Sequence, residues 1–158
     1  MRLEGRVAVV DTNVVVSALI GRSSDAPPAR ILDAMLGGRM PFVLSLDLLA
    51  EYRGVLCRPF AVARHGLSEA EVDEILQALA LSAIESPSDV SSPETAEGIP
   101  TGVQSIPTSV EEQDAHVARL VLSMPGAALV SGDRDLQRAL EGHCALAKPA
   151  EFAEDSVL

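Results

Sequence analysis

Short apolar runs alternate along the chain with longer segments that have helical spacing or helical propensity. The apolar runs, rich in Val, Leu and Ala, predict strands buried on both faces. They cover residues 6–10, 41–45, 127–131 and 144–148. The predicted helices cover residues 13–20, 30–38, 46–58, 67–84, 111–124 and 134–142. Because parallel strands need crossovers of about a dozen residues or more, we expect a three-layer α/β/α fold with a central, mostly parallel sheet of about four to five strands.

Proline and serine mark several helix boundaries. Pro27 and Pro28 are placed to open the helix that follows them, since proline is favoured in the first helical turn. Ser68 and Glu71 have the spacing of a capping box, which predicts a helix start. Pro59 predicts the end of the helix before it.

Residues 86–110 form a stretch without clear periodicity. Pro, Ser, Thr and Gly dominate it, which is typical of a loop, although a short strand is expected near residues 103–106. A chain of 158 residues with 47% hydrophobic content suits one core. We therefore expect one domain spanning residues 1–158, with 86–110 as a long loop inside it.

The composition also bears on where the protein works. The sequence has no uninterrupted apolar run of about 18 residues, which an ordinary membrane-spanning helix needs. The apolar run near the N-terminus lacks the cationic start and cleavage pattern of a secretory signal. Cys57 and Cys144 have no metal-binding spacing and are expected to be reduced. We expect a cytoplasmic protein that does not associate with membranes.

Acidic residues follow two of the predicted strands. Asp11 comes directly after the strand 6–10, and Asp133 follows the strand 127–131 by one glycine, with Asp135 two residues further. In open α/β sheets, ligands bind outside the carboxyl ends of the strands. We expect these carboxylates at that edge. Asp11 and Asp133 also suit helix N-caps, which is the structural alternative.

Two further acids lie on apolar stripes of predicted helices. Glu51 shares its stripe with Leu48 and Val55, and Asp114 lies four residues before Ala118. A carboxylate on an apolar face costs free energy unless it is paired or bound to a cation. The structural alternative for Asp114 is an acid at the N-terminus of a helix, where it interacts favourably with the helix dipole. Because Mg²⁺ and Mn²⁺ prefer oxygen ligands, the four acids together favour a divalent-metal site for phosphoryl chemistry.

Four segments of the sequence, in this order, resemble the acidic motifs of PIN-domain ribonucleases, especially the bacterial toxin–antitoxin (VapC-like) members. They read DTNVVVSAL, LLAEYRGVL, EEQDAHVARL and LVSGDRDL, and the later LAKPAEF resembles the strand-turn-helix ending of that group. The resemblance covers roughly residues 7–153. It implies a Mg²⁺- or Mn²⁺-dependent endoribonuclease that forms a homodimer and is restrained by a cognate antitoxin.

The resemblance also assigns residues. The implied catalytic and metal-binding acids are Asp11, Glu51, Asp114 and Asp133, with Asp135 as a fifth acid at the metal or behind it. The implied supporting residues, which would orient these carboxylates through hydrogen bonds, are Thr12, Asn13 and Ser131. The third motif lacks the acidic run common in the group, so Glu111 or Glu112 is an alternative to Asp114. His116 is interpreted as a structural residue.

The formal net charge of −11 argues against a protein that coats nucleic acid by electrostatics. It does not exclude an enzyme that meets phosphates through metal ions. Candidates for a local phosphate clamp are Arg22, Arg30, Arg53, Arg58, Arg134 and Arg138. With 3% aromatic residues, we expect no stacking platform for bases.

Two other classes of function fit parts of the pattern. A non-catalytic module with the same fold would bind only a partner protein, and it would show no Mn²⁺ site in a calorimetric titration. A receiver-like phosphoacceptor domain is suggested by Asp11 together with Lys148 and Pro149. It is disfavoured because such domains carry adjacent acids on the first strand, whereas Val10 precedes Asp11 here.

Overall fold

The computed structural model describes residues 3–84, 106–156 and 158. Most of the predicted loop 86–110 lies outside the described residues, as does most of the strand expected near 103–106. Residues 106–110 are irregular, and residue 106 is in no strand.

A parallel sheet lies at the centre of the fold. Its strands are β1 (Ala8–Val10), β2 (Ala128–Val130) and β3 (Ala145–Ala147), in the order β1-β2-β3. Every residue of β1 and β2 is buried, because helices cover both faces. The register sets Val10 opposite Val130, so that β1 and β2 end at the same level. The α/β class is confirmed.

The predicted number of strands is wrong, because the described residues contain three strands rather than four or five. The apolar segment 41–45 lies beside β1, but it pairs there through the single bridge between Ala8 and Phe42. Pro41 has no N–H to extend the ladder, and Ser45 already caps the next helix. The sheet is therefore continued at this edge only by isolated bridges.

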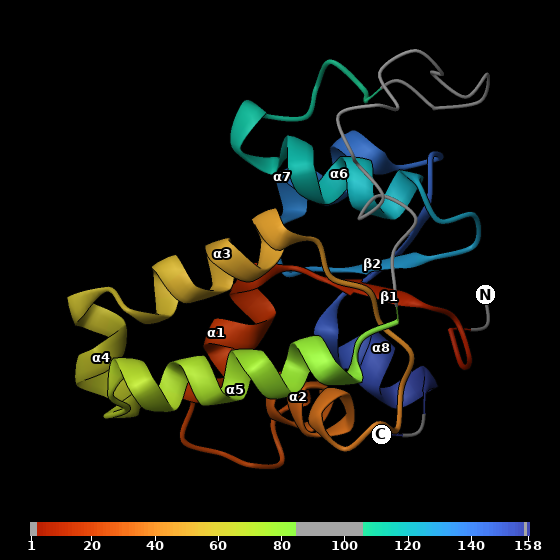
Figure 1. Cartoon of the computed structure of the whole chain (residues 1–158). Helices are drawn as coiled ribbons and strands as arrows, with labels where there is room; N and C mark the ends of the chain where they lie inside the picture. The colour runs from red at the N-terminus through yellow and green to blue at the C-terminus, as the bar shows by residue number, and fades with distance from the viewer. Residues whose placement is uncertain (1–2, 85–105, 157) are drawn as a thin grey trace.

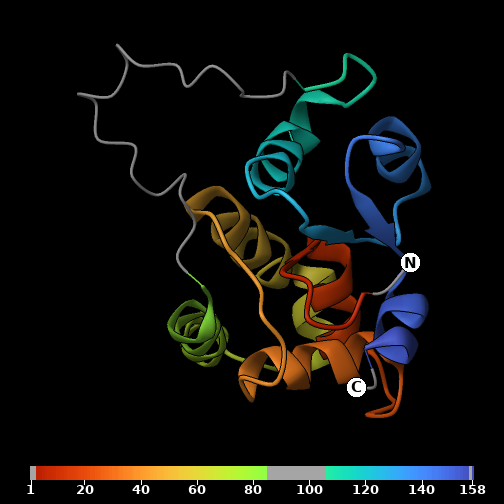
Figure 2. The same cartoon turned by 90° about the vertical axis from the view of Figure 1, so that its right-hand side faces the viewer.

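Helices enclose the sheet from both sides. They are α1 (Thr12–Ile20), α2 (Pro27–Leu36), α3 (Leu46–Leu56), α4 (Pro59–His65), α5 (Glu69–Ser82), η3 (Glu112–Asp114, a 3₁₀ turn), α6 (Ala115–Leu122), α7 (Arg134–Leu140) and α8 (Pro149–Asp155). In Figures 1 and 2, α6 and α7 lie on one side of the sheet, and α1, α2 and α8 lie on the other. This arrangement gives the expected three layers.

Most helix boundaries follow the sequence signals. Ser68 and Glu71 form the predicted capping box at the start of α5. The helix before Pro59 ends at Leu56, and Pro59 then opens α4, which the sequence did not predict. The predicted helix 111–124 is split at Asp114 into η3 and α6.

Other expectations concern cysteine and membranes. Both cysteines are free and partly buried, as expected. Within the described ranges, no helix combines the length and the apolar character that crossing a membrane requires.

Candidate active site

Asp11 joins the end of β1 to the start of α1. Its backbone N–H donates to the carbonyl of Val130 at 2.9 Å, which extends the sheet ladder to this residue. Oδ1 accepts from the N–H of Thr12 at 2.8 Å and caps α1. Oδ2 accepts from the Ser131 hydroxyl at 2.7 Å and from the Asn13 amide at 3.2 Å. The carboxylate is 6% exposed, and hydrogen bonds compensate its burial.

Ser131 connects the two strand ends. Its hydroxyl donates to Asp11 and accepts from the N–H of Asp133 at 3.0 Å. The side-chain oxygen of Asn13 accepts from the N–H of Gly132 at 3.3 Å. The turn after β1 and the turn after β2 are therefore held together by side chains from both.

Asp133 caps α7, as the structural alternative anticipated. Its Oδ1 accepts from the N–H groups of Asp135 at 2.9 Å and Leu136 at 3.2 Å. Capping engages one carboxylate oxygen, so Oδ2 remains outside these two bonds. Asp133 thus caps the helix with only one of its two carboxylate oxygens.

Glu51 reaches the same edge from α3. Its Oε2 accepts from the Thr12 hydroxyl and lies 3.5 Å from Nε2 of His116. The next residue, Tyr52, is fully buried and donates its hydroxyl to the carbonyl of Val10. Tyr52 therefore attaches α3 to the end of β1, directly before Asp11.

One hollow brings the four predicted acids together. It has a volume of about 430 Å³, and its acidic lining residues are Asp11, Glu51, Asp114 and Asp133. Thr12 and Asn13 also line it, whereas Ser131 is fully buried behind Asp11. These acids come from the junction of β1 and α1, from α3, from the η3–α6 junction and from the turn before α7, so only tertiary structure unites them.

The proximity of these acids changes their ionisation. Burial and the negative charges of Asp11, Asp133, Glu51 and Glu111 raise the pKa of Asp114 to about 6. The pKa of Asp11 is also raised, chiefly by burial, although the bonds from Ser131 and Thr12 oppose the shift. The hollow therefore concentrates negative charge that a cation would relieve.

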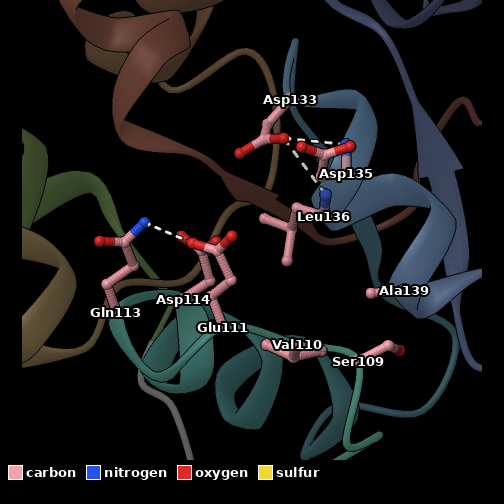
Figure 3. Close-up of a pocket in the computed structure, with 9 residues that line it drawn as sticks. All are labelled: Ser109, Val110, Glu111, Gln113, Asp114, Asp133, Asp135, Leu136 and Ala139. Carbon is pink, nitrogen blue, oxygen red and sulfur yellow. Dashed lines mark hydrogen bonds between the residues drawn. The ribbon is translucent and has the colours of Figure 1, made fainter.

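A second hollow, shown in Figure 3, adjoins the first. Glu111 and Asp114 lie on one of its walls, and Asp133 and Asp135 lie on the other. Asp114 and Asp133 line both hollows, whereas Glu111 and Asp135 line only the second. Of the three alternatives for the third acid, Asp114 is the one that lines the hollow of Asp11.

Two residues at this edge, His116 and Tyr52, are not among the residues that the sequence assigns to the site. His116, which the sequence indicates as a structural residue, lies beside Glu51, and its Nδ1 is buried with no hydrogen-bond partner among the described residues. For Tyr52, the signal in the sequence is its position directly after Glu51. Burial, reinforced by Asp11 and Glu51, raises the pKa of Tyr52 well above its usual value.

The candidate arginines lie in different parts of the structure. Arg58 lines the hollow of the four acids, and its side chain forms no ion pair within the described part of the chain. Arg53 instead pairs with Asp73 at 2.8 Å. Arg134 and Arg138 line a different hollow together with Lys148. Arg58 is thus the arginine placed to meet a ligand of the acids.

The donor set fits a hard divalent cation, since it consists of carboxylate oxygens with unfavourable mutual repulsion. Across the described residues, no group of three or more His, Cys, Asp or Glu side chains forms a ready-made metal site. Mg²⁺ keeps several waters and usually binds through one or two carboxylates, so its chemistry does not require such a group.

Comparison with known protein families matches residues 7–135 to the PIN domain. Comparisons with curated proteins and with solved structures gave no significant match. The family match covers most of the chain and includes all of the acids discussed above. The chain therefore belongs to the PIN domain family.

Proposed function

We propose that this protein is a metal-dependent endoribonuclease that hydrolyses RNA phosphodiester bonds. PIN domains are generally nucleases, which supports the class of reaction. The observation that carries the proposal is the hollow lined by four acids from four separate segments. A purely structural protein gains nothing from this arrangement, because like charges held together oppose folding.

The proposed cofactor is Mg²⁺ or Mn²⁺. The residues that would hold it are Asp11, Glu51, Asp114 and Asp133, with Asp135 supporting them from the adjoining hollow. Such an ion, when bound, lowers the pKa of a coordinated water and polarises a phosphoryl oxygen.

The surrounding side chains orient these carboxylates. Ser131 and Asn13 hold one oxygen of Asp11, and Thr12 holds one oxygen of Glu51. Nε2 of His116 lies 3.5 Å from the same oxygen of Glu51. Arg58, at the edge of the hollow, would bind a phosphate of the RNA backbone.

The finer assignment rests on the motif resemblance. We propose that the protein is the toxin of a type II toxin–antitoxin system, acting in the cytoplasm as a homodimer and restrained by a cognate antitoxin. Induced expression should then arrest bacterial growth, and expression of a small protein encoded next to it should restore growth. Growth unaffected by the active protein would contradict this assignment.

The receiver-like alternative loses its support. Lys148, which suggested it, lines the hollow of Arg134 and Arg138 and not the hollow of Asp11. The non-catalytic alternative is tested by calorimetric titration with Mn²⁺, because a module that only binds a protein has no need of a metal site. A stoichiometric Mn²⁺ site that Asp11→Asn abolishes would argue against it.

Asp11→Asn tests the proposed reaction. The substitution keeps the size of the side chain but removes the charge, so Mn²⁺-dependent cleavage of single-stranded RNA should fall by about 100-fold or more, while a cooperative melting curve checks that the variant still folds. Asp33→Asn is a matched control, since Asp33 is an exposed acid on α2 and does not line the hollow. Equal cleavage by Asp11→Asn and wild type would refute the proposal.

A further inference from the structure

The chain contains four aromatic residues, and they differ sharply in exposure. Phe42, Tyr52 and Phe152 are at most 1% exposed and belong to the core. Phe60 is 52% exposed. It lines the same hollow as the four acids, so the one aromatic ring open to a ligand lies at the candidate active site.

The local structure explains why Phe60 lies there. Arg58 is the extended N-cap of α4, and Pro59 begins that helix. The change of direction between α3 and α4 brings Arg58 and Phe60 to the edge of the hollow. α4 packs against α1, which begins directly after Asp11.

The lining of the hollow contains two chemically different kinds of side chain. Its acidic lining consists of four carboxylates, and its apolar lining consists of Val16, Val55 and Phe60. Val16 is buried and Val55 is half-buried, so the phenyl ring supplies most of the reachable apolar contact. A nucleotide has the matching division, because its phosphate is charged and its base offers an apolar face.

We propose that Phe60 stacks on a base of the RNA strand next to the phosphodiester held in the acidic hollow, while Arg58 binds a neighbouring phosphate. This inference rests on the proposed ribonuclease function. It adds a single stacking residue to a chain from which we expected no stacking platform for bases. Because every base has a π face, the contact would bind RNA without selecting its sequence.

A protein segment is the competing occupant of the exposed ring. The observations favour a base, since the ring shares its hollow with four acids and an arginine and has only two other apolar neighbours there. A peptide would need a larger apolar surface to bind stably.

The test measures binding of a fluorescein-labelled single-stranded RNA by anisotropy, with Ca²⁺ replacing Mn²⁺ to suppress cleavage. A series of RNAs carries one abasic position at a time. For wild type, affinity should fall about tenfold or more when one particular base is missing. Phe60→Ala should lose the same factor with intact RNA and lose nothing further with that abasic RNA, since ring and base contribute one shared contact.

Variants at the same position separate stacking from apolar contact. Phe60→Tyr keeps an aromatic face and should bind like wild type, whereas Phe60→Leu should lose most of the abasic sensitivity. Leu81→Ala is the control, because Leu81 is 82% exposed on α5 and lies outside the hollow. All four variants should retain the wild-type melting temperature.

The outcomes distinguish the two proposals. If wild type cleaves RNA with Mn²⁺ and Phe60→Ala binds every RNA as wild type does, the stacking role alone is overturned. Continued sensitivity of Phe60→Ala to the abasic position would also overturn it. Wild type that neither cleaves nor binds RNA would overturn the ribonuclease function and the stacking role together.

Discussion

At the residue scale, Asp11 and Asp133 cap helices and also line the acidic hollow. Each caps a helix through one carboxylate oxygen. The second oxygen of Asp11 accepts from Ser131 and Asn13, which hold the carboxylate at the edge of the hollow. Capping therefore orients each carboxylate and does not exclude a metal-binding role.

Ser131→Ala should destabilise the fold. Ser131 is fully buried, and the substitution leaves the N–H of Asp133 and one oxygen of Asp11 without its hydroxyl. We expect a loss of about 1–3 kcal/mol in the free energy of unfolding, measured by urea denaturation. Ser23→Ala, at an exposed serine, should cost less than about 0.5 kcal/mol. Equal losses would show that Ser131 does not hold the two turns.

The raised pKa of Asp114 predicts how metal-free stability depends on pH. Because this pKa is about 6, against 3.8 for an unperturbed Asp, the folded chain binds the proton more tightly than the unfolded chain. The contribution of Asp114 to the free energy of unfolding should therefore increase as the pH falls through 6 towards 4.

Asp114→Asn should remove that contribution. In EDTA, the variant should be more stable than wild type at pH 7.5 by less than about 1 kcal/mol, since the half-exposed carboxylate is screened by water. The difference should shrink at pH 5. Melting curves at both pH values check this, and a difference that does not depend on pH would contradict it.

At the element scale, the site is built by strand ends that share one level. The register of β1 and β2 sets Val10 opposite Val130, so Asp11 and Ser131 follow at the same edge. Tyr52 then attaches α3 to that edge through the carbonyl of Val10. The position of Glu51 therefore depends on a bond made by its neighbour.

Tyr52→Phe should loosen α3. The substitution removes one buried hydroxyl and leaves the ring in place, so the free energy of unfolding should fall by about 1 kcal/mol in urea denaturation. Cleavage of RNA should fall as well, because Glu51 loses a fixed support. Unchanged stability and cleavage would show that the bond to Val10 does not position α3.

Sequence patterns predicted most elements but not all of their limits. Hydrophobic runs indicated β1, β2 and β3, because a strand buried on both faces has a distinctive composition. They did not show that 41–45 pairs through isolated bridges, since composition does not report how many ladder bonds form. The positions of Asp11 and Asp133 could also be predicted, because both residues follow strands that the hydrophobic runs indicate. The contact of His116 with Glu51 and the exposure of Phe60 depend on how α6, α3 and α4 pack, which periodicity does not determine.

At the scale of the whole molecule, the net charge of −11 and the acidic hollow predict that divalent ions stabilise the fold. An ion that binds only the folded state at 100 times its dissociation constant adds about 2.7 kcal/mol. For a chain of this size, that raises the melting temperature by about 5–10 °C.

Mn²⁺ should therefore raise the melting temperature of wild type and of Asp33→Asn, but not that of Asp11→Asn. Differential scanning fluorimetry over a range of Mn²⁺ concentrations measures the effect. An equal rise in all three proteins would place the stabilising ions elsewhere on the acidic surface.

The convergence of the acids on a divalent ion is tested most directly by anomalous scattering from a crystal grown with saturating Mn²⁺. We predict a manganese peak in the hollow lined by Asp11, Glu51, Asp114 and Asp133, with carboxylates from at least two of these residues as ligands. A hollow without manganese in that crystal, or manganese bound only at other acids, would contradict the account.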